Sequence, residues 1–221
     1  MSIAQNLSRI SEELTEGVTL VAVSKTKPVE DLQEAYDCGQ RVFGENKIQE
    51  MAAKYEQLPK DIQWHMIGHV QTNKIKYMAP FVSLVHGCDR VKVLKELNKE
   101  ARKNNRVIDC LLQVHIAQEE TKFGFSEEEI LAFAGSEEAQ SFENINIVGL
   151  MGMATFTDDK DQIEQEFRTL AQLFNSLKDK SLFTNFSTLS MGMSGDYGLA
   201  IECGSNMVRI GSSIFGARNY N

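Results

Sequence analysis

The chain alternates short apolar segments with amphipathic segments along its whole length, and this alternation constrains the fold more than any other feature. Aliphatic and β-branched residues are typical of strands buried on both faces of a parallel sheet. Eight segments have this character: 18–23, 41–43, 62–67, 82–85, 107–114, 145–150, 186–190 and 207–210. Eight repeated β-α units predict an α/β fold, a single closed (β/α)8 TIM-type barrel. An open doubly wound sheet is the alternative that the pattern leaves open.

Helical periodicity fills most of the intervals between these segments. Before the first strand, four apolar residues share one helical face at spacings of four, three and four: Ile3, Leu7, Ile10 and Leu14. We therefore expect an extra N-terminal helix. Further along, Asp89 is placed to cap the helix that follows segment 82–85, and Ser126 with Glu129 has the spacing of a capping box.

The composition is that of an ordinary globular chain, and it narrows the class of protein. The 221 residues contain three prolines and no shift in composition that would mark a linker, so we expect one domain spanning 1–221. The excess of 31 acidic over 23 basic residues argues against a nucleic-acid or membrane-surface binder. No apolar run reaches the length of a membrane span, and the N-terminus does not resemble a signal peptide. Four scattered cysteines without a C-x-x-C pair favour reduced thiols, and therefore a cytoplasmic location.

A lysine stands directly after the first strand, where the active site of a parallel barrel is found. Lys25 follows the buried run 18–23 by two residues. Partial desolvation at such a position lowers the pKa of an amine and favours Schiff-base chemistry. The alternative is a solvated loop lysine without a catalytic or binding role.

Two glycine- and hydroxyl-rich loops near the C-terminus are candidates for phosphate binding. They span 189–198 and 208–213, each after a strand and before an expected helix. Backbone N–H groups in such turns bind phosphate, and in barrels the loops after strands seven and eight are the usual site. Tight turns without a ligand are the alternative. Neither a Walker A motif nor G-x-G-x-x-G is present, so the phosphate need not belong to a nucleotide.

An arginine interrupts the last apolar segment. Arg209 would point into the barrel, where its charge requires an acceptor or a ligand; Glu202 is the ordinary structural partner. His65 and His69 lie four apart on an expected strand, too far separated to bind one metal ion, and we expect no metal site.

Together these motifs closely resemble the pyridoxal phosphate homeostasis proteins over essentially the whole chain. The motifs are AVSKTKP at 22–28, FGEN at 43–46, WHMIG at 64–68, QTNK at 71–74, LSMGMS at 189–194 and VRIGS at 208–212. The resemblance implies the barrel of the alanine racemase N-terminal domain and pyridoxal 5′-phosphate (PLP) as the cofactor. It also implies a set of cofactor-binding residues: Lys25, Asn46, His65, Met191, Ser194, Arg209, Gly211 and Ser212.

The resemblance also implies a role for the main members of this set. Lys25 would hold PLP as an internal aldimine, and Ser194, Gly211 and Ser212 would bind the phosphate. Arg209 would face the pyridine nitrogen; because it stays charged, it would disfavour protonation of the ring and weaken the ring as an electron sink. Similar racemases add a tyrosine from a separate C-terminal domain, whereas this chain ends within a dozen residues of Arg209.

We therefore expect a non-catalytic protein that buffers or delivers PLP inside the cell without appreciable amino-acid turnover. PLP-dependent apo-enzymes would be its partners, with no nucleic acid or membrane, and the protein would be a monomer, with a dimer as the alternative. The rival function is a racemase-like enzyme or a Schiff-base aldolase acting on a sugar phosphate. Departures from the family pattern around His69, His115 and 120–124 leave open the roles of Lys27 and Lys122 at the pocket rim.

Overall fold

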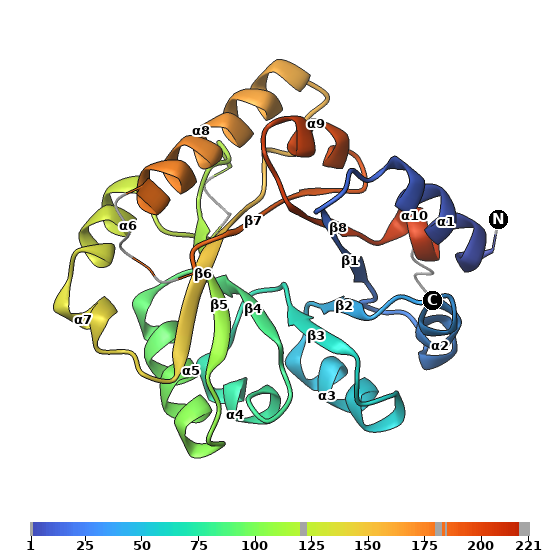
Figure 1. Cartoon of the computed structure of the whole chain (residues 1–221), viewed down its shortest axis with the longest axis horizontal. Coiled ribbons are helices and arrows are strands. Elements are labelled where there is room, and N and C mark those ends of the chain that lie inside the picture. Colours follow the sequence, from blue (N-terminus) through green and yellow to red (C-terminus); the bar gives the residue numbers. More distant parts are fainter. Residues whose placement is uncertain (1, 120–122, 180–182, 184, 217–221) are drawn as a thin grey trace.

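The protein forms a closed barrel of eight parallel strands surrounded by helices (Figure 1). The computed structural model describes residues 2–119, 123–179, 183 and 185–216. Strands follow one another in sequence order around the barrel, and β8 pairs with β1. The strands are β1 Thr19–Val23, β2 Val42–Glu45, β3 Gln63–Met66, β4 Leu84–Cys88, β5 Ile108–Val114, β6 Ile145–Gly152, β7 Thr188–Met193 and β8 Met207–Ile210. The predicted barrel is confirmed, and the open sheet is excluded.

Helices connect the strands and cover the outside of the barrel. They are α1 Ile3–Glu13, α2 Val29–Asp37, α3 Ile48–Gln57, the 3-10 helix η1 Thr72–Lys74, α4 Ile75–Met78, α5 Val91–Lys103, α6 Glu127–Ala134, α7 Glu137–Gln140, α8 Lys160–Asp179, α9 Tyr197–Glu202 and α10 Ser212–Phe215. Helix α1 is the expected N-terminal addition, and it packs against α10 and α2.

Of the two helix caps predicted from the sequence, one is confirmed and the other is wrong. Ser126 caps α6 with the expected capping box, in which Glu129 bonds back to the Ser126 amide. The prediction that Asp89 caps α5 is wrong, because α5 begins one residue later, after Arg90, and has no side-chain cap. The Asp89 carboxylate instead pairs with Arg90 and with Nδ1 of His69, at 2.9 Å.

All eight strands occupy the predicted places, but several run further than the apolar pattern indicates. β4 continues to Cys88, β6 to Gly152 and β7 to Met193. Each extension contains a glycine (Gly87, Gly152 and Gly192), and His86 adds a polar side chain in β4, so these stretches lack the continuous aliphatic pattern of a buried strand.

Strand alternation divides the core into two layers. Outward side chains such as Phe43, Trp64 and Met191 pack between the barrel and the helices. An inner cluster fills the barrel itself, with Val21, Leu84, Leu111, Met151 and Met207 as its buried members. Two residues further along three of these strands, the next inward position is polar: His86 after Leu84, Gln113 after Leu111 and Arg209 after Met207. The barrel therefore has an apolar floor below a polar layer at its carboxyl end.

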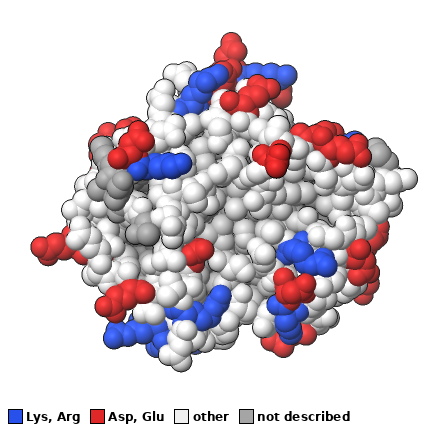
Figure 2. Space-filling view, in the orientation of Figure 1, with Lys and Arg blue, Asp and Glu red and all other residues white. Residues whose placement is uncertain are grey.

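Charged side chains decorate the outside of the molecule. In the view of Figure 2, acidic and basic residues lie mainly around the periphery and are interspersed. No helix in the described ranges is long and apolar enough to cross a membrane.

Candidate cofactor site

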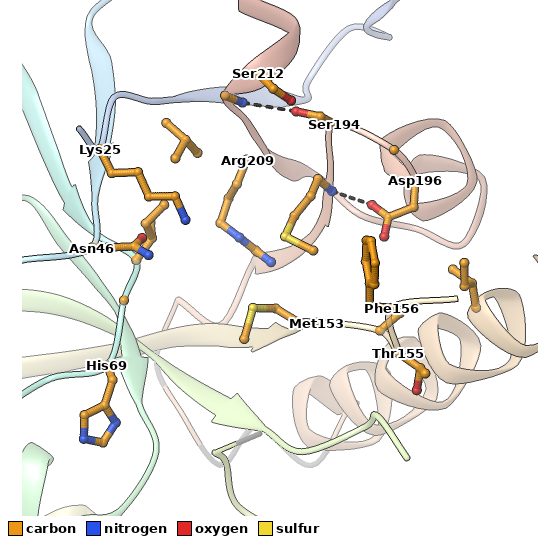
Figure 3. Close-up of a pocket in the computed structure, with 18 of the residues that line it drawn as sticks. Lys25, Asn46, His69, Met153, Thr155, Phe156, Ser194, Asp196, Arg209 and Ser212 are labelled. Carbon is orange, nitrogen blue, oxygen red and sulfur yellow. Dashed lines mark hydrogen bonds between the residues drawn. The ribbon is translucent and has the colours of Figure 1, made fainter. Parts of the chain in front are cut away.

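A cavity of about 710 Å³ opens at the carboxyl ends of the strands. Six of the eight predicted cofactor-binding residues line it: Lys25, Asn46, Ser194, Arg209, Gly211 and Ser212 (Figure 3). They come from β8 and from the loops after β1, β2, β7 and β8. All strands of a parallel barrel end at the same face. Residues that directly follow different strands therefore lie close together, although they are far apart in the sequence.

Lys25 enters the cavity from the loop after β1, beside Asn46 (Figure 3). Its backbone leaves the sheet immediately before it, since Ser24 N–H makes a last ladder bond to the Gly44 carbonyl at 3.0 Å. Thr26, on its other side, adopts a left-handed backbone with φ of 63°. The half-buried lysine is thus presented by a short, sharply turned segment rather than by a flexible loop.

Arg209 projects from β8 into the polar layer and is 4% exposed. Its Nη1 donates to Ser190 Oγ at 2.6 Å, and its Nη2 donates to the Gly152 carbonyl at 3.0 Å. Within the described chain its hydrogen bonds go to these two residues and not to Glu202, the partner that the sequence suggested. Burial lowers the pKa of Arg209 to about 10, so the guanidinium remains charged at neutral pH.

A pair of buried histidines continues the network from Arg209. Ser190 Oγ lies 3.1 Å from Nδ1 of His86, whose Nε2 lies 3.0 Å from Nδ1 of His65. Burial lowers the pKa of His65 to about 3, and burial, together with the charge of Arg209, lowers that of His86. Two neutral histidines therefore brace Ser190 and, through it, the orientation of the guanidinium.

Neither His65 nor Met191 lines the cavity. His65 lies below it in the histidine pair, and its route to the site runs through His86 and Ser190. Met191 points outward into the layer between barrel and helices, whereas its strand neighbour two residues on, Met193, lines the cavity. On a regular strand two such residues would face the same side, but the β7–β8 register shifts between Ser190 and Met193 and Gly192 has a φ of 95°. This irregularity separates the two methionine side chains, so direct cofactor contact does not follow for Met191.

The loops after β7 and β8 meet at the cavity wall. Gly211 N–H donates to Ser194 Oγ at 3.3 Å, a bond drawn in Figure 3 between the two loops. A Cβ at Gly211 would lie 3.1 Å from the Val23 carbonyl oxygen, so a side chain there would press on β1. Hydroxyls and amides of both loops are thereby held at one end of the cavity, on the side where Ser212 lies.

Sequence reasoning missed several residues of the network and of the rim. His86 directly follows the predicted segment 82–85, a position that could have identified it; Ser190 lies in the predicted loop 189–198, but its bond to Arg209 was not predicted. The loop after β6 adds Met153, Thr155 and Phe156, the last 96% exposed. The predicted segment 145–150 is shorter than β6, which extends to Gly152. The apolar pattern therefore did not indicate where the loop after β6 begins. Lys27 lines the cavity and donates to the Phe215 carbonyl at 2.7 Å; Lys122 lies outside the described residues.

Over the part of the chain that the structure covers, no three His, Cys, Asp or Glu side chains are grouped to bind a metal ion. The functional groups that line the cavity are instead an amine, a guanidinium and the hydroxyls of two loops.

The closed barrel and this donor set define the class of barrels related to the N-terminal domain of alanine racemase, and the model of that domain family matches residues 1–219. The pyridoxal phosphate homeostasis protein of Pasteurella multocida is 38% identical over the full length of both chains. That of Helicobacter pylori is 41% identical over 90% of this chain and 87% of its own. The chain belongs to the pyridoxal phosphate homeostasis protein family.

Solved structures give the same relationship at the level of the fold. PipY of Synechococcus elongatus PCC7942, with PLP bound, superposes with a TM-score of 0.89 at 30% identity over 97% of this chain and all of its own. Alanine racemase from Bartonella henselae has a TM-score of 0.74 at 16% identity, over 97% of this chain and 58% of that chain. The second likeness concerns the barrel alone.

Proposed function

We propose that this protein binds PLP, with the cofactor aldehyde held as a Schiff base on Lys25 Nζ, and that it buffers or delivers PLP in the cytoplasm. The observation that carries this proposal is the convergence of Lys25, Arg209 and the two hydroxyl-bearing loops on one cavity. The names of the relatives and the PLP-bound PipY structure support it. The unit of function would be one domain spanning 1–221.

The donor set fits the three chemical parts of PLP. An amine on Lys25 suits the aldehyde, and the charged Arg209 suits the lone pair of the pyridine nitrogen. Ser194, Gly211 and Ser212 line the cavity and would offer hydroxyls and backbone amides to a phosphate. Asn46 stands beside the lysine, and His65 would act only through the histidine pair that braces Arg209.

Arg209 favours a carrier over an enzyme. Bound PLP supplies an aldehyde that forms imines and a ring that withdraws electrons. A guanidinium that keeps its proton would donate a hydrogen bond to the ring nitrogen and would leave that nitrogen unprotonated, which would weaken electron withdrawal. We therefore propose little or no amino-acid turnover, with PLP-dependent apo-enzymes as recipients and the monomer as the working form.

Absorbance and borohydride reduction test the binding site. The purified protein should bind PLP with the yellow absorbance of a lysine imine, and borohydride should fix the cofactor mass on the peptide carrying Lys25. Lys25→Ala should lose both signals, whereas Lys47→Ala, at an exposed position outside the cavity, should keep them. A colourless wild-type protein with no mass on Lys25 would refute the proposal.

Turnover is tested separately. Incubating the PLP-loaded protein with single enantiomers of amino acids should give no racemisation beyond that of free PLP. Protein-dependent racemisation that disappears in Lys25→Ala would establish an enzyme instead. A stable adduct between Lys25 and a sugar phosphate would favour an aldolase.

A further inference from the structure

A buried charged cluster lies directly behind the segment that carries Lys25, on the opposite side from the cavity. Its members are Glu45 at the end of β2 and Glu50 and Lys54 on α3. Glu45 is fully buried and Lys54 is 5% exposed. None of the three lines the cavity. Buried charges are costly unless they are paired and hydrogen-bonded, so such a cluster in a small barrel needs an explanation beyond stability.

The ammonium group of Lys54 donates hydrogen bonds to three acceptors. Its Nζ donates to Glu45 Oε1 at 2.7 Å, to Glu50 Oε1 at 2.8 Å and to the backbone carbonyl of Ser24 at 2.7 Å. An ammonium group has three donors, so these contacts use its full hydrogen-bonding capacity. One of the three holds the residue immediately before Lys25.

The two glutamates hold both sides of Lys25. Ser24 Oγ donates to Glu45 Oε1 at 2.6 Å, and Thr26 N–H donates to Glu50 Oε1 at 2.6 Å. Thr26 is one of the few non-glycine residues with a positive φ, a conformation that needs support from its surroundings. The segment has already left the sheet, so these side chains take over from the ladder bonds that end at Ser24.

We propose that Glu45, Glu50 and Lys54 are positioning residues that fix the Ser24–Thr26 backbone and thereby aim Lys25 Nζ into the cavity. The inference rests on the proposed function for the identity of the aldehyde, but the clamp on the backbone is a property of the chain itself. The cluster acts through Lys25 and touches no bound ligand. Its removal should therefore impair attachment of the cofactor aldehyde to the lysine more than binding of the rest of the cofactor.

Glu50 is the residue of choice for the test, because its side chain is 23% exposed and its replacement need not disturb the core. Glu50→Gln should slow covalent uptake of PLP about tenfold, from the loss of hydrogen bonds to a charged acceptor. Affinity for pyridoxine 5′-phosphate, which has an alcohol in place of the aldehyde, should stay within about twofold, since that analogue cannot react with Lys25. Glu50→Asp, which keeps a carboxylate, should recover part of the rate.

Glu56→Gln is the matched control, on the same helix but exposed and away from the segment. It should change neither quantity. The proposal is overturned if Glu50→Gln takes up PLP at the wild-type rate, or if it weakens PLP and the analogue equally, because equal losses mean general damage to the pocket.

Amide hydrogen exchange separates this inference from the proposed function. In PLP-free protein, Glu50→Gln should speed exchange of the Thr26 amide at least several-fold relative to Glu56→Gln, since that amide loses its charged acceptor. If the wild-type protein takes up neither PLP nor the analogue, the proposed function fails while this measurement still decides the clamp. Unchanged exchange at Thr26 would overturn the clamp whatever the cofactor result.

Discussion

Replacing Glu45 with glutamine should change how the stability of the protein depends on pH. Burial raises the pKa of Glu45 from 4.5 to about 7, although Lys54 and Ser24 favour the ionised form. The folded state thus binds the proton more tightly than the unfolded state. The corresponding contribution to stability is complete below pH 4.5, falls as the pH rises through 7 and is absent above that. At about 1.4 kcal/mol per pKa unit, the decline amounts to about 3 kcal/mol.

Glu45→Gln cannot ionise, so its stability should lack this decline. The variant has its own cost, because an amide pairs less well with Lys54, but that cost does not follow the titration of Glu45. The stability of the variant minus that of the wild type should therefore increase by about 3 kcal/mol between pH 4.5 and pH 8.

Urea unfolding of PLP-free protein, followed by fluorescence, measures this difference. Trp64 is the single tryptophan and is fully buried between barrel and helices, so it reports on the packed core. Unfolding free energies at half-unit steps of pH give the two curves, with Glu56→Gln as the exposed control. Parallel curves for wild type and Glu45→Gln would refute the reasoning, since they would mean that Glu45 is ionised across the whole range.

Three further predictions follow from the site and the barrel. Arg209→Gln should keep PLP but shift its absorbance, because the environment of the ring nitrogen changes while the phosphate loops remain; an unchanged spectrum would make the arginine purely structural. Ser194→Ala should retain PLP less well on dialysis, by about 1.5–3 kcal/mol for a hydrogen bond to a charged group, and equal retention would remove Ser194 from the phosphate site. Gly149→Ala should destabilise the protein by more than about 2 kcal/mol in urea unfolding, since its Cβ would lie 1.7 Å from the Thr188 carbonyl oxygen and push β6 from β7. Gly198→Ala, with no atom within 4 Å of the added Cβ, is the control that should stay near wild type.

The sequence predicts those parts of the site that depend on position along a strand. Lys25 and the two glycine-rich loops follow apolar segments directly, and barrel geometry brings the ends of those segments to one face. Arg209 stands out because a charge in an apolar strand needs a partner. Its partners Ser190 and Gly152 lie on β7 and β6, the neighbouring strand and the one beyond it, and were not predictable because they depend on the register of these strands and on the irregularity in β7.

The cluster of Glu45, Glu50 and Lys54 behind Lys25 could not be predicted from the sequence either. Glu45 lies two residues beyond the predicted strand segment 41–43, and Lys54 has the sequence context of an ordinary helical lysine. Only the packing of α3 against β2, with Lys54 reaching the Ser24 carbonyl just after β1, makes them a buried pair. Contacts between the side chains of strands and those of helices leave no periodic signal in the sequence. Hydrophobic periodicity indicates which face of an element is buried, but not which residues pack against that face.

Pairing between the first and last strands determines when, during synthesis, the cavity comes into existence. Val21 of β1 lies in register with Arg209 of β8, so the amine and the guanidinium of one site are supplied from opposite ends of the chain. A chain still emerging from the ribosome already carries Lys25 but lacks the loops after β7 and β8. Such a chain has the amine of Lys25 without a cavity around it. Stable capture of PLP would thus report that translation has passed β8 and that the last strand has docked, and PLP added during refolding should favour chains that have completed this step.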